Sequence, residues 1–327
     1  MSKLVTIFGG SGFLGRYIAR RMAKQGWRVK VAVRKPNEAL FVKTYGSVGQ
    51  VEPIFCNIRD DGMVMMALQG ADAVVNCIGT FDKTGKNNFV AIQSEGAVRI
   101  ARLAAAAGIA KMVHISSIGA DADSDSVYSS TKASGEIGIL KHLPNSIILR
   151  PSVIFGSEDQ FFNRFATMSK MSPFLPLIGA QTKFQPVYVD DVASAAVNAV
   201  TGNVEAGIYE LGGPEVASFE DLMQRMLDVI KRQRLLLKIP FFAARIMAWG
   251  FDLLHRASFG ILKNGIVTSD QVKSLRVDNI VSGAHKTFSD LEIVPTALDA
   301  VLPEYLWPYR PSGQFFAIKD SAKKFSK

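Results

Sequence analysis

Short apolar runs alternate with amphipathic helical stretches through the first 155 residues, and this alternation limits the possible folds more than any other feature. The runs are apolar or β-branched almost throughout, as strands buried on both faces should be. They comprise residues 4–9, 28–33, 51–57, 72–79, 111–117 and 146–156. The helical stretches, each with a glycine at or just past its C-terminal end, comprise residues 15–26, 61–70 and 94–108. Repeated β-α-β units of this kind predict a parallel sheet with helices on both faces.

The alternation therefore predicts an α/β protein with a doubly wound sheet of the Rossmann type. We expect this domain at residues 1–156, with further core elements at about 184–201. A smaller, mainly helical C-terminal domain at 157–312 is interleaved with the core, and residues 313–327 form a flexible basic tail. In the smaller domain, "SFEDLMQRMLDVIKRQ" predicts a helix with Ser218 as its N-cap.

The composition is that of an ordinary globular protein, with 48% hydrophobic and 20% charged residues. Cys56 and Cys77 both fall in apolar runs predicted as strands, so we expect buried free thiols and a reducing compartment. The four histidines are scattered without metal-ligand spacing, so no metal site is predicted. The net charge of +9 favours acidic partners or reflects a basic solvated surface. No nucleic-acid-binding signature accompanies it, so nucleic acid is not an expected partner.

The chain starts with a predicted strand and a glycine turn, "KLVTIFGG", and shows neither a signal peptide nor a transit segment. We therefore expect a bacterial protein or a processed form. The most hydrophobic stretch, residues 235–254, contains Pro240 and three charged residues, which makes it a poor transmembrane span.

A glycine-rich turn joins the first predicted strand to the first predicted helix in "TIFGGSGFLGRYIARRM". Its GxxGxxG spacing allows a tight turn, and the following helix presents free N–H groups to a pyrophosphate. The alternative is that the glycines only allow close helix packing. We expect this turn to hold a dinucleotide through Gly9, Ser11, Gly12, Phe13, Leu14 and Gly15.

The second predicted strand ends in two basic residues, Arg34 and Lys35. An NAD site usually has a carboxylate here for the ribose 2′-hydroxyl, whereas a guanidinium suits a 2′-phosphate. The sequence therefore predicts NADPH or NADP+ over NAD, with a solvated basic pair as the alternative reading.

Two further strand ends complete the predicted nucleotide site, because open α/β sheets bind ligands outside the carboxyl ends of their strands. Asn57 and Ile58 follow the third strand, where the adenine should rest. Cys77, Ile78 and Gly79 follow the fourth and should line the pyrophosphate and ribose.

Tyr128 and Lys132 lie four residues apart in "DSVYSSTKASGE", a spacing that puts both on one face of a helix. A reductase uses such a pair as general acid and as the cation that lowers its pKa. A protein without turnover can use the same pair to hold a nicotinamide ribose. The sequence leaves both readings open.

Five motifs in combination resemble the extended or atypical short-chain dehydrogenase/reductase superfamily over about residues 4–215. They are "GGSGFLG", the serine pair in "HISSIGA", "YSSTK", "LRPSVIFG" and "PVYVDDVA". The resemblance implies that Ser117 (or Ser116), Tyr128 and Lys132 form the catalytic set. Lys132 would bind the nicotinamide ribose and favour the phenolate of Tyr128, which would pass a proton to a substrate carbonyl. Gln93 stands nearest to an asparagine that many members use in a proton relay.

The motifs also imply that the cofactor contacts Ser116, Pro151 and Val153. One branch is similar over nearly the whole chain, through "RPSVIFGSEDQFFNRFATM", "KFQPVYVDDVASAAVNAV" and "LWPYRP". It is the NADPH-binding accessory subunit of respiratory complex I (NADH:ubiquinone oxidoreductase). That resemblance implies a structural subunit on the peripheral arm, near the membrane and the quinone site. The expected location is peripheral on the cytoplasmic face of a bacterial inner membrane, or on the matrix side of the mitochondrial inner membrane.

Residues 235–256 are predicted to present an aromatic-rich helical surface on which Lys238, Arg245 and Asp252 recur every seven residues, and Pro240 suits the first turn of a helix that starts there. Such a helix suits a membrane surface. The alternative is a core or lid helix of the smaller domain.

Three functions remain open on sequence alone. The first is the complex I subunit with no turnover of its own. The second is a free-standing NADPH-dependent reductase, epimerase or dehydratase acting on a small molecule. The third is a redox-sensing regulator.

Overall fold

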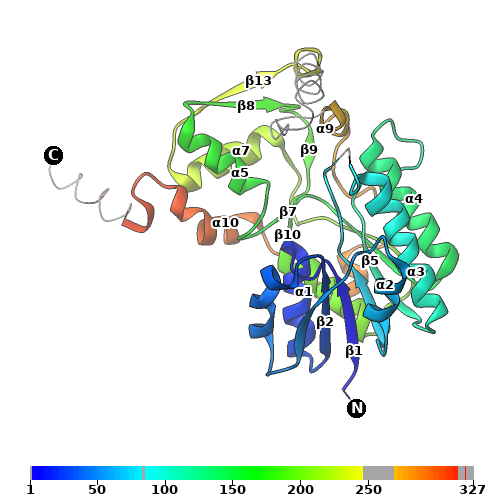
Figure 1. Cartoon of the computed structure of the whole chain (residues 1–327). Coiled ribbons are helices and arrows are strands. Elements are labelled where there is room, and N and C mark those ends of the chain that lie inside the picture. Colours follow the sequence, from blue (N-terminus) through cyan, green and yellow to red (C-terminus); the bar gives the residue numbers. More distant parts are fainter. Residues whose placement is uncertain (1, 83–84, 246–268, 316–320, 322–327) are drawn as a thin grey trace. The chain divides into compact units, whose positions relative to one another are not determined.

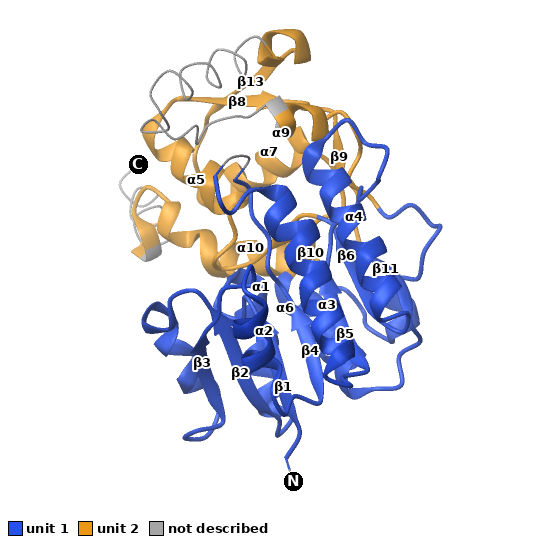
Figure 2. Cartoon of the chain, turned by 45° about the vertical axis from the view of Figure 1, so that its right-hand side comes forward, with its two compact units in different colours: residues 1–152, 189–212, 281–295 blue, residues 153–188, 213–280, 296–327 orange. Residues whose placement is uncertain are grey.

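The computed structural model describes residues 2–82, 85–245, 269–315 and 321. These residues form two compact units, each built from three stretches of the chain (Figure 2). Unit 1 comprises residues 1–152, 189–212 and 281–295. Unit 2 comprises residues 153–188, 213–280 and 296–327. The stretch 281–295, which the sequence reading gave to the smaller domain, is thus part of unit 1.

Unit 1 is built on a seven-stranded sheet in which every pairing is parallel (Figure 1). Its strands are β1 (Leu4–Phe8), β2 (Arg28–Val33), β3 (Val51–Phe55), β4 (Ala73–Asn76), β5 (Lys111–Ile115), β6 (Ile147–Pro151) and β11 (Gly207–Leu211). Their order is β11-β6-β5-β4-β1-β2-β3. The chain moves outward in opposite directions from β1 and β4, so the topological switch point lies between these two strands.

Helices cover both faces of this sheet, as the predicted doubly wound fold requires (Figure 2). The helices are α1 (Phe13–Lys24), α2 (Asp61–Leu68), α3 (Glu95–Ala106), α4 (Val127–His142) and α6 (Val189–Thr201). Helix α1 packs against α6, whereas α3 packs between α2 and α4. The inner strands are buried because their apolar side chains meet a helix layer on each face, whereas the outer strand β3 is partly exposed. The predicted α/β fold is confirmed.

Some unit 1 elements differ from their prediction. The run predicted as one strand at 146–156 divides into β6 in the large sheet and β7 (Ile154–Phe155), which pairs with β10 (Val187–Tyr188) in unit 2. A 3-10 helix (Pro36–Tyr45) and a π-turn (Val90–Ser94) were not predicted. Cys56 and Cys77 follow strands rather than lie within them.

Unit 2 is mainly helical, with short strand pairs. Its helices are α5 (Phe162–Met171), α7 (Phe219–Ile230), α9 (Ser269–Ser274) and α10 (Leu298–Leu306). Strand β8 (Phe174–Ile178) pairs in parallel with β13 (Leu235–Ile239), and β9 (Lys183–Phe184) pairs with β12 (Ala217–Ser218). Ser218 caps α7 by accepting a hydrogen bond from the Asp221 N–H at 3.1 Å, which confirms the predicted N-cap.

Lys238, Arg245 and Asp252 were predicted to share one face of a helix, and this prediction is wrong for Lys238. Lys238 lies on β13, where its ammonium pairs with Glu220 at 2.8 Å. The run "LLLKI" is a strand because the unpaired edge of β8 offers it a hydrogen-bonding partner. Helical residues begin only after Pro240, and Asp252 lies outside the described residues.

A buried carboxylate joins two helices of unit 2. Asp159 accepts hydrogen bonds from the Tyr305 hydroxyl at 2.6 Å and from the backbone N–H groups of Gly156, Phe161 and Asn163. Burial raises the pKa of Asp159, and these hydrogen bonds oppose the rise. The bond from Tyr305 fastens α10 to the segment that leads into α5.

Candidate functional site

The glycine turn lies after β1 and brings α1 close to the sheet. Gly9 has φ +77°, and its carbonyl accepts a hydrogen bond from the Gly12 N–H at 2.9 Å. A Cβ at Gly15 would lie 2.3 Å from the Gly9 oxygen and 2.7 Å from the Gly10 Cα, so no side chain fits there. Gly12 caps α1 without a side-chain hydrogen bond among the described residues. The first N–H groups of α1 therefore face outward beside a backbone that a pyrophosphate can approach.

Basic side chains lie beside this turn at the end of β2. Arg34 and Lys35 are both exposed, and Lys35 pairs with Glu38 at 2.7 Å. A third cation, Arg16, was missed from the sequence. Its guanidinium donates to the carbonyls of Ser11 (3.3 Å) and Gly12 (3.4 Å) and lies 5.0 Å from the centre of the Phe41 ring. Its position directly after Gly15, the third glycine of the motif, could have indicated that Arg16 lies at the glycine turn.

The ends of β3 and β4 contribute the other predicted nucleotide contacts. Asn57 is half-buried and accepts a hydrogen bond from the Arg59 N–H, while Ile58 is buried. After β4, a Cβ on Gly9 would lie only 3.0 Å from the Ile78 side chain, so this strand end borders the glycine turn directly. The segment after β4 thus lies at the switch point, whereas Asn57 and Ile58 follow the outer strand β3, and their contact with an adenine stays a prediction.

Neither cysteine is suited to nucleophilic chemistry. Both are free thiols, Cys56 being buried and Cys77 half-buried. Burial raises the pKa of Cys56 to about 11 and that of Cys77 to about 12, so neither is a thiolate near neutral pH.

The structure brings Ser117, Tyr128 and Lys132 together at the ends of β5 and α4. The Ser117 hydroxyl is buried without a hydrogen-bond partner of normal geometry among the described residues, yet it lies close enough to lower the pKa of Tyr128. Burial outweighs this and raises the pKa of the phenol above its usual value. The expectation that Lys132 favours the phenolate when a nucleotide is bound stays a prediction.

Lys132 is almost completely buried, and its ammonium donates to the Ile115 carbonyl at 3.1 Å. Burial lowers the pKa of Lys132 to about 8, against the opposing charge of Glu136. A Cβ on Gly79 would lie 4.0 Å from the Lys132 Nζ, so the ammonium also borders the strand end after β4. The side chain is placed to meet a ligand at that edge.

Two phenylalanines enclose the Tyr128 ring, which the sequence reading missed. Phe81 is stacked on it, with ring centres 5.8 Å apart and planes 8° apart, and Phe89 meets it edge-on. Phe81 itself is 74% exposed. Both come from the segment after β4, where no local pattern indicates which ring they will meet.

Gln93, the residue expected near a proton relay, is tied into the scaffold. Its side-chain nitrogen donates to the Thr80 carbonyl at 2.8 Å, and its oxygen accepts from the Thr131 hydroxyl at 3.1 Å. It lies on the π-turn before α3. Pro151 ends β6 in unit 1, whereas Val153 begins unit 2, so the cofactor contact predicted for both stays a prediction.

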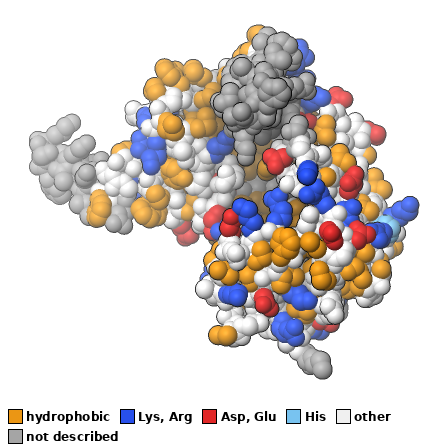
Figure 3. Space-filling model, viewed as in Figure 1, with side chains coloured by type: hydrophobic (Ala, Val, Ile, Leu, Met, Phe, Trp, Pro, Cys, Tyr) orange, Lys and Arg blue, Asp and Glu red, His pale blue; other side chains and the backbone are white. Residues whose placement is uncertain are grey.

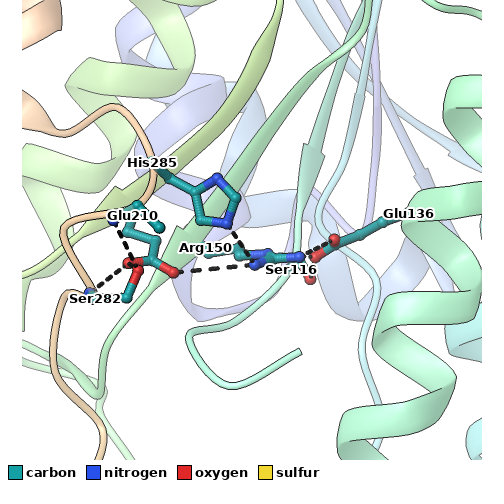
Figure 4. A network of polar contacts seen from close by, with 7 residues as sticks. Ser116, Glu136, Arg150, Glu210, Ser282 and His285 are labelled. Carbon is teal, nitrogen blue, oxygen red and sulfur yellow. Dashed lines mark hydrogen bonds and ion pairs between the residues drawn. The ribbon is translucent and has the colours of Figure 1, made fainter. Parts of the chain in front are cut away.

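A buried polar network extends from the other serine of the pair (Figure 4). The Ser116 hydroxyl donates to Glu136, which also accepts two hydrogen bonds from Arg150 at 2.9 and 2.6 Å. Arg150 lies 3.9 Å from Glu210 and 3.3 Å from His285. The Ser116 side chain is therefore engaged away from Tyr128, and Ser117 is the member of the pair that faces the phenol.

The far end of this network reaches residues 281–285. Glu210 accepts hydrogen bonds from both the N–H and the hydroxyl of Ser282, at 2.6 and 2.7 Å. The Glu210 N–H in turn donates to the Lys286 carbonyl at 2.8 Å. These contacts fasten a segment late in the sequence to the end of β11.

Comparison with known proteins agrees with this architecture. Residues 5–212 match the model of the NAD dependent epimerase/dehydratase family. The crystal structure of gox2253 is similar with a TM-score of 0.69 and 21% identity, covering 96% of this chain and 99% of that one. The Bordetella bronchiseptica enzyme WbmG in complex with NAD gives a TM-score of 0.63 at 16% identity, over 73% of this chain and 82% of that chain. At such identities the structures show a shared fold.

Three curated relatives are similar in sequence. NADH dehydrogenase (ubiquinone) 1 alpha subcomplex subunit 9, mitochondrial, of Arabidopsis thaliana is 35% identical over 98% of this chain and 81% of that protein. Its counterpart in Dictyostelium discoideum is 30% identical over 98% and 89%. Ceramide reductase of Caulobacter vibrioides is 27% identical over 72% and 74%. The chain therefore belongs to the NAD dependent epimerase/dehydratase family, and its similarity to the alpha subcomplex subunit 9 proteins extends over nearly its whole length.

Proposed function

We propose that the chain is an NADP(H)-holding accessory subunit of respiratory complex I with little or no turnover of its own. One observation carries this proposal: the similarity to the alpha subcomplex subunit 9 relatives covers 98% of the chain, whereas the family model ends at residue 212. Most of unit 2 and the late segment 281–295 are thus part of what the chain shares with those subunits.

The site residues fit a dinucleotide. The space at Gly15 excludes any side chain, and the uncapped start of α1 offers N–H groups to a pyrophosphate. Lys132 would hold the nicotinamide ribose, and Tyr128 would stand beside it. The nicotinamide supplies hydride chemistry when bound, but a ribose clamp needs none of it.

Arg34 supports NADPH over NADH as the ligand. Its side chain is exposed at the end of β2, and the neighbouring Lys35 is already paired with Glu38. Arg34→Ala should weaken NADPH binding by about tenfold or more while leaving NADH binding nearly unchanged. Lys35→Ala is the matched control and should lose less. Nucleotide fluorescence titrations measure both, and a wild-type chain that binds NADH more tightly would refute the choice.

The state of Tyr128 supports a clamp rather than a reductase. Its pKa is raised by burial, and Phe81 covers one face of its ring. A neutral phenol still donates a hydrogen bond to a ribose hydroxyl, so it holds a nucleotide without becoming a phenolate.

The proposed location is the surface of the inner membrane, on its cytoplasmic side in a bacterium or its matrix side in a mitochondrion. No helix of the described ranges combines the length and hydrophobicity needed to cross a bilayer. Unit 2 carries an exposed apolar face on the β8–β13 pair, where Leu235 opposes Phe174 and Leu237 opposes Pro176. Figure 3 shows hydrophobic side chains beside Lys and Arg over this region.

Charge supports an anionic lipid surface as the partner of that face. The segments 160–182 and 229–245, which contain β8 and β13, carry seven Lys and Arg residues and no Asp or Glu. Exposed apolar side chains rimmed by cations suit an anionic headgroup layer. Within the predicted membrane segment 235–256, the proposal of a lipid contact is limited to residues 235–245, which the structure describes.

Vesicle flotation tests the lipid contact. The wild-type chain should float with vesicles containing phosphatidylglycerol and remain unbound with phosphatidylcholine alone. Leu237→Ser should weaken flotation several-fold, because it removes an exposed apolar contact from the β8–β13 face. The control Met65→Ser removes an apolar side chain of nearly equal exposure from α2 (40%, against 42% for Leu237) and should float like the wild type. Equal flotation of all variants would remove residues 235–245 from the proposal.

The subunit assignment is tested by native separation of gently solubilised membranes from the source cells. Detection of this chain with the NADH:quinone oxidoreductase assembly is the expected result. A chain that runs alone in the soluble fraction would overturn the assignment.

A second function, an NADPH-dependent reductase acting on an apolar small molecule, is favoured by one comparison. Ceramide reductase of Caulobacter vibrioides resembles 72% of the chain, and Ser117, Tyr128 and Lys132 are all present here. Incubation of the purified chain with NADPH and long-chain carbonyl compounds separates the two functions. Turnover on the scale of ordinary enzymes, about 1 per second or faster, would favour the reductase.

A further inference from the structure

Glu136 lies one helical turn beyond Lys132, on the same side of α4. It is buried, 3% exposed, and it is the point where Ser116 and Arg150 meet (Figure 4). A buried carboxylate needs partners, and Arg150 and Ser116 supply them to Glu136 one helical turn from Lys132. Helix packing alone would be served by an apolar residue.

We propose that Glu136 is a positioning residue, which keeps the buried Lys132 side chain charged and fixes the strand end that presents Ser117 to Tyr128. The proposal rests on the nucleotide site proposed above and assigns to that site an internal counter-charge.

The surroundings of Lys132 support the first half of this role. Its ammonium donates to the Ile115 carbonyl, and the titratable groups around it are Cys77 after β4, His114 on β5, and Tyr128 and Glu136 on α4. The Cys77 thiol is neutral near pH 7, the pKa of His114 is lowered well below its usual value, and the phenol is neutral. Glu136 is then the nearby group that supplies negative charge.

Backbone pairing supports the second half. The N–H groups of Ser116 and Ile118 donate to the β6 carbonyls of Leu149 and Pro151, at 2.7 and 3.0 Å, so the β5 ladder continues past its last strand residue. The bond from Ser116 to Glu136 fastens this strand end to α4, the helix that carries Tyr128, at the residue next to Ser117.

The network also balances charge. Glu136 and Glu210 carry two negative charges, and Arg150 and Lys132 carry two positive ones. Asp121 acts on Arg150 from the segment between β5 and α4. Removal of Glu136 or of Glu210 changes the formal charge equally, but only Glu136 lies next to Lys132 on α4. The two glutamates therefore form a matched pair of test positions.

The test is the titration of Lys132 in the full chain without nucleotide. Lysine labelled with ¹³C at the ε position reports each ammonium by NMR, and Lys132 is assigned as the signal lost in Lys132→Met. Glu136→Gln should lower the pKa of Lys132 by about one unit, from about 8 to near 7. Glu210→Gln should leave it within about 0.3 unit. An unchanged value in Glu136→Gln, or equal shifts in both variants, would overturn the proposal.

A second variant covers the case in which Glu136→Gln does not fold. Arg150→Gln removes the cation that neutralises Glu136, so the pKa of Lys132 should rise by about one unit. A fall, or no change, would contradict the role of Glu136.

Nucleotide binding gives a separate readout. A pKa near 7 leaves Lys132 half neutral at pH 7, so Glu136→Gln should lose several-fold in NADPH affinity there and recover it at pH 6. If the wild type binds no nucleotide, the proposed function fails while the NMR titration still decides the role of Glu136. If it binds but the variant shows no pH-dependent loss, the counter-charge role fails.

Discussion

Substitution of Gly15 by alanine tests how tightly the glycine turn is built. The added Cβ would lie 2.3 Å from the Gly9 oxygen, roughly 1 Å inside ordinary contact, and its other close neighbours are also backbone atoms. Relief requires α1 to move away from the turn. That helix is fixed at its far end by Arg21, which donates two hydrogen bonds of 2.6 Å to Asp190 on α6.

The cost should lie near the upper end of the range for overpacking, about 3 kcal/mol. In a chain of 327 residues, such a loss lowers the unfolding temperature by roughly 4 °C. Movement of the turn by roughly 1 Å also displaces the N–H groups offered to the pyrophosphate. We expect NADPH affinity to fall at least about tenfold, which corresponds to about 1.4 kcal/mol.

Thermal unfolding with and without NADPH measures both effects. The control is Gly62→Ala on α2, where the Cβ would lie 3.3 Å from the Asp60 carboxylate and where alanine favours a helix by up to about 1 kcal/mol. The control should be as stable as the wild type. A Gly15→Ala chain with the wild-type unfolding temperature and affinity would refute the argument that backbone contact at this glycine controls the site.

Three further predictions concern buried polar groups. Tyr128→Phe should weaken NADPH binding only a few-fold if the pair is a clamp, whereas a reductase should lose at least about 100-fold in rate; both are measurable on one preparation. Lys132→Met should raise the unfolding temperature by about 2–5 °C, because the ammonium is buried at a cost, while NADPH binding falls. Tyr305→Phe removes a bond that opposes the raised pKa of Asp159, so the ionised carboxylate becomes more costly above that pKa. Thermal melts should show a loss of about 1.5–3 kcal/mol at pH 7 that shrinks as the pH falls through the raised pKa of Asp159, where the carboxyl gains its proton.

The core of unit 1 was predictable because its signals are local. A buried parallel strand needs a continuous apolar run, and a turn that closely approaches a helix needs glycine. Residues 4–15 contain both patterns and therefore predict a strand followed by a glycine turn. The helix N-cap at Ser218 follows from one residue and its neighbours in the same way. Tyr128 and Lys132 could be singled out together because they are four residues apart, about one helical turn.

Features decided by distant partners could not be predicted. The run at 235–239 is as apolar as a buried helix, and only the free edge of β8 makes it a strand. Glu136, Arg150 and Glu210 are ordinary charged residues in the sequence, and their pairing depends on three elements that meet only in the folded sheet. The position of Phe81 likewise could not be predicted, because it is stacked on the ring of Tyr128, which is distant in the sequence.

The division of unit 1 into three stretches of chain affects how the protein is made. On the ribosome, β6 emerges with an open edge and waits for roughly 55 further residues before β11 can pair with it. The Glu210 carboxylate then waits for roughly 70 more before Ser282 arrives. At about 5–20 residues per second, the edge of β6 waits several seconds for β11. The Glu210 carboxylate then waits several seconds for Ser282. Synthesis therefore passes through a stage in which β1 to β6 are present but the sheet edge completed by β11 and Ser282 is still open, and products truncated before residue 281 remain at that stage.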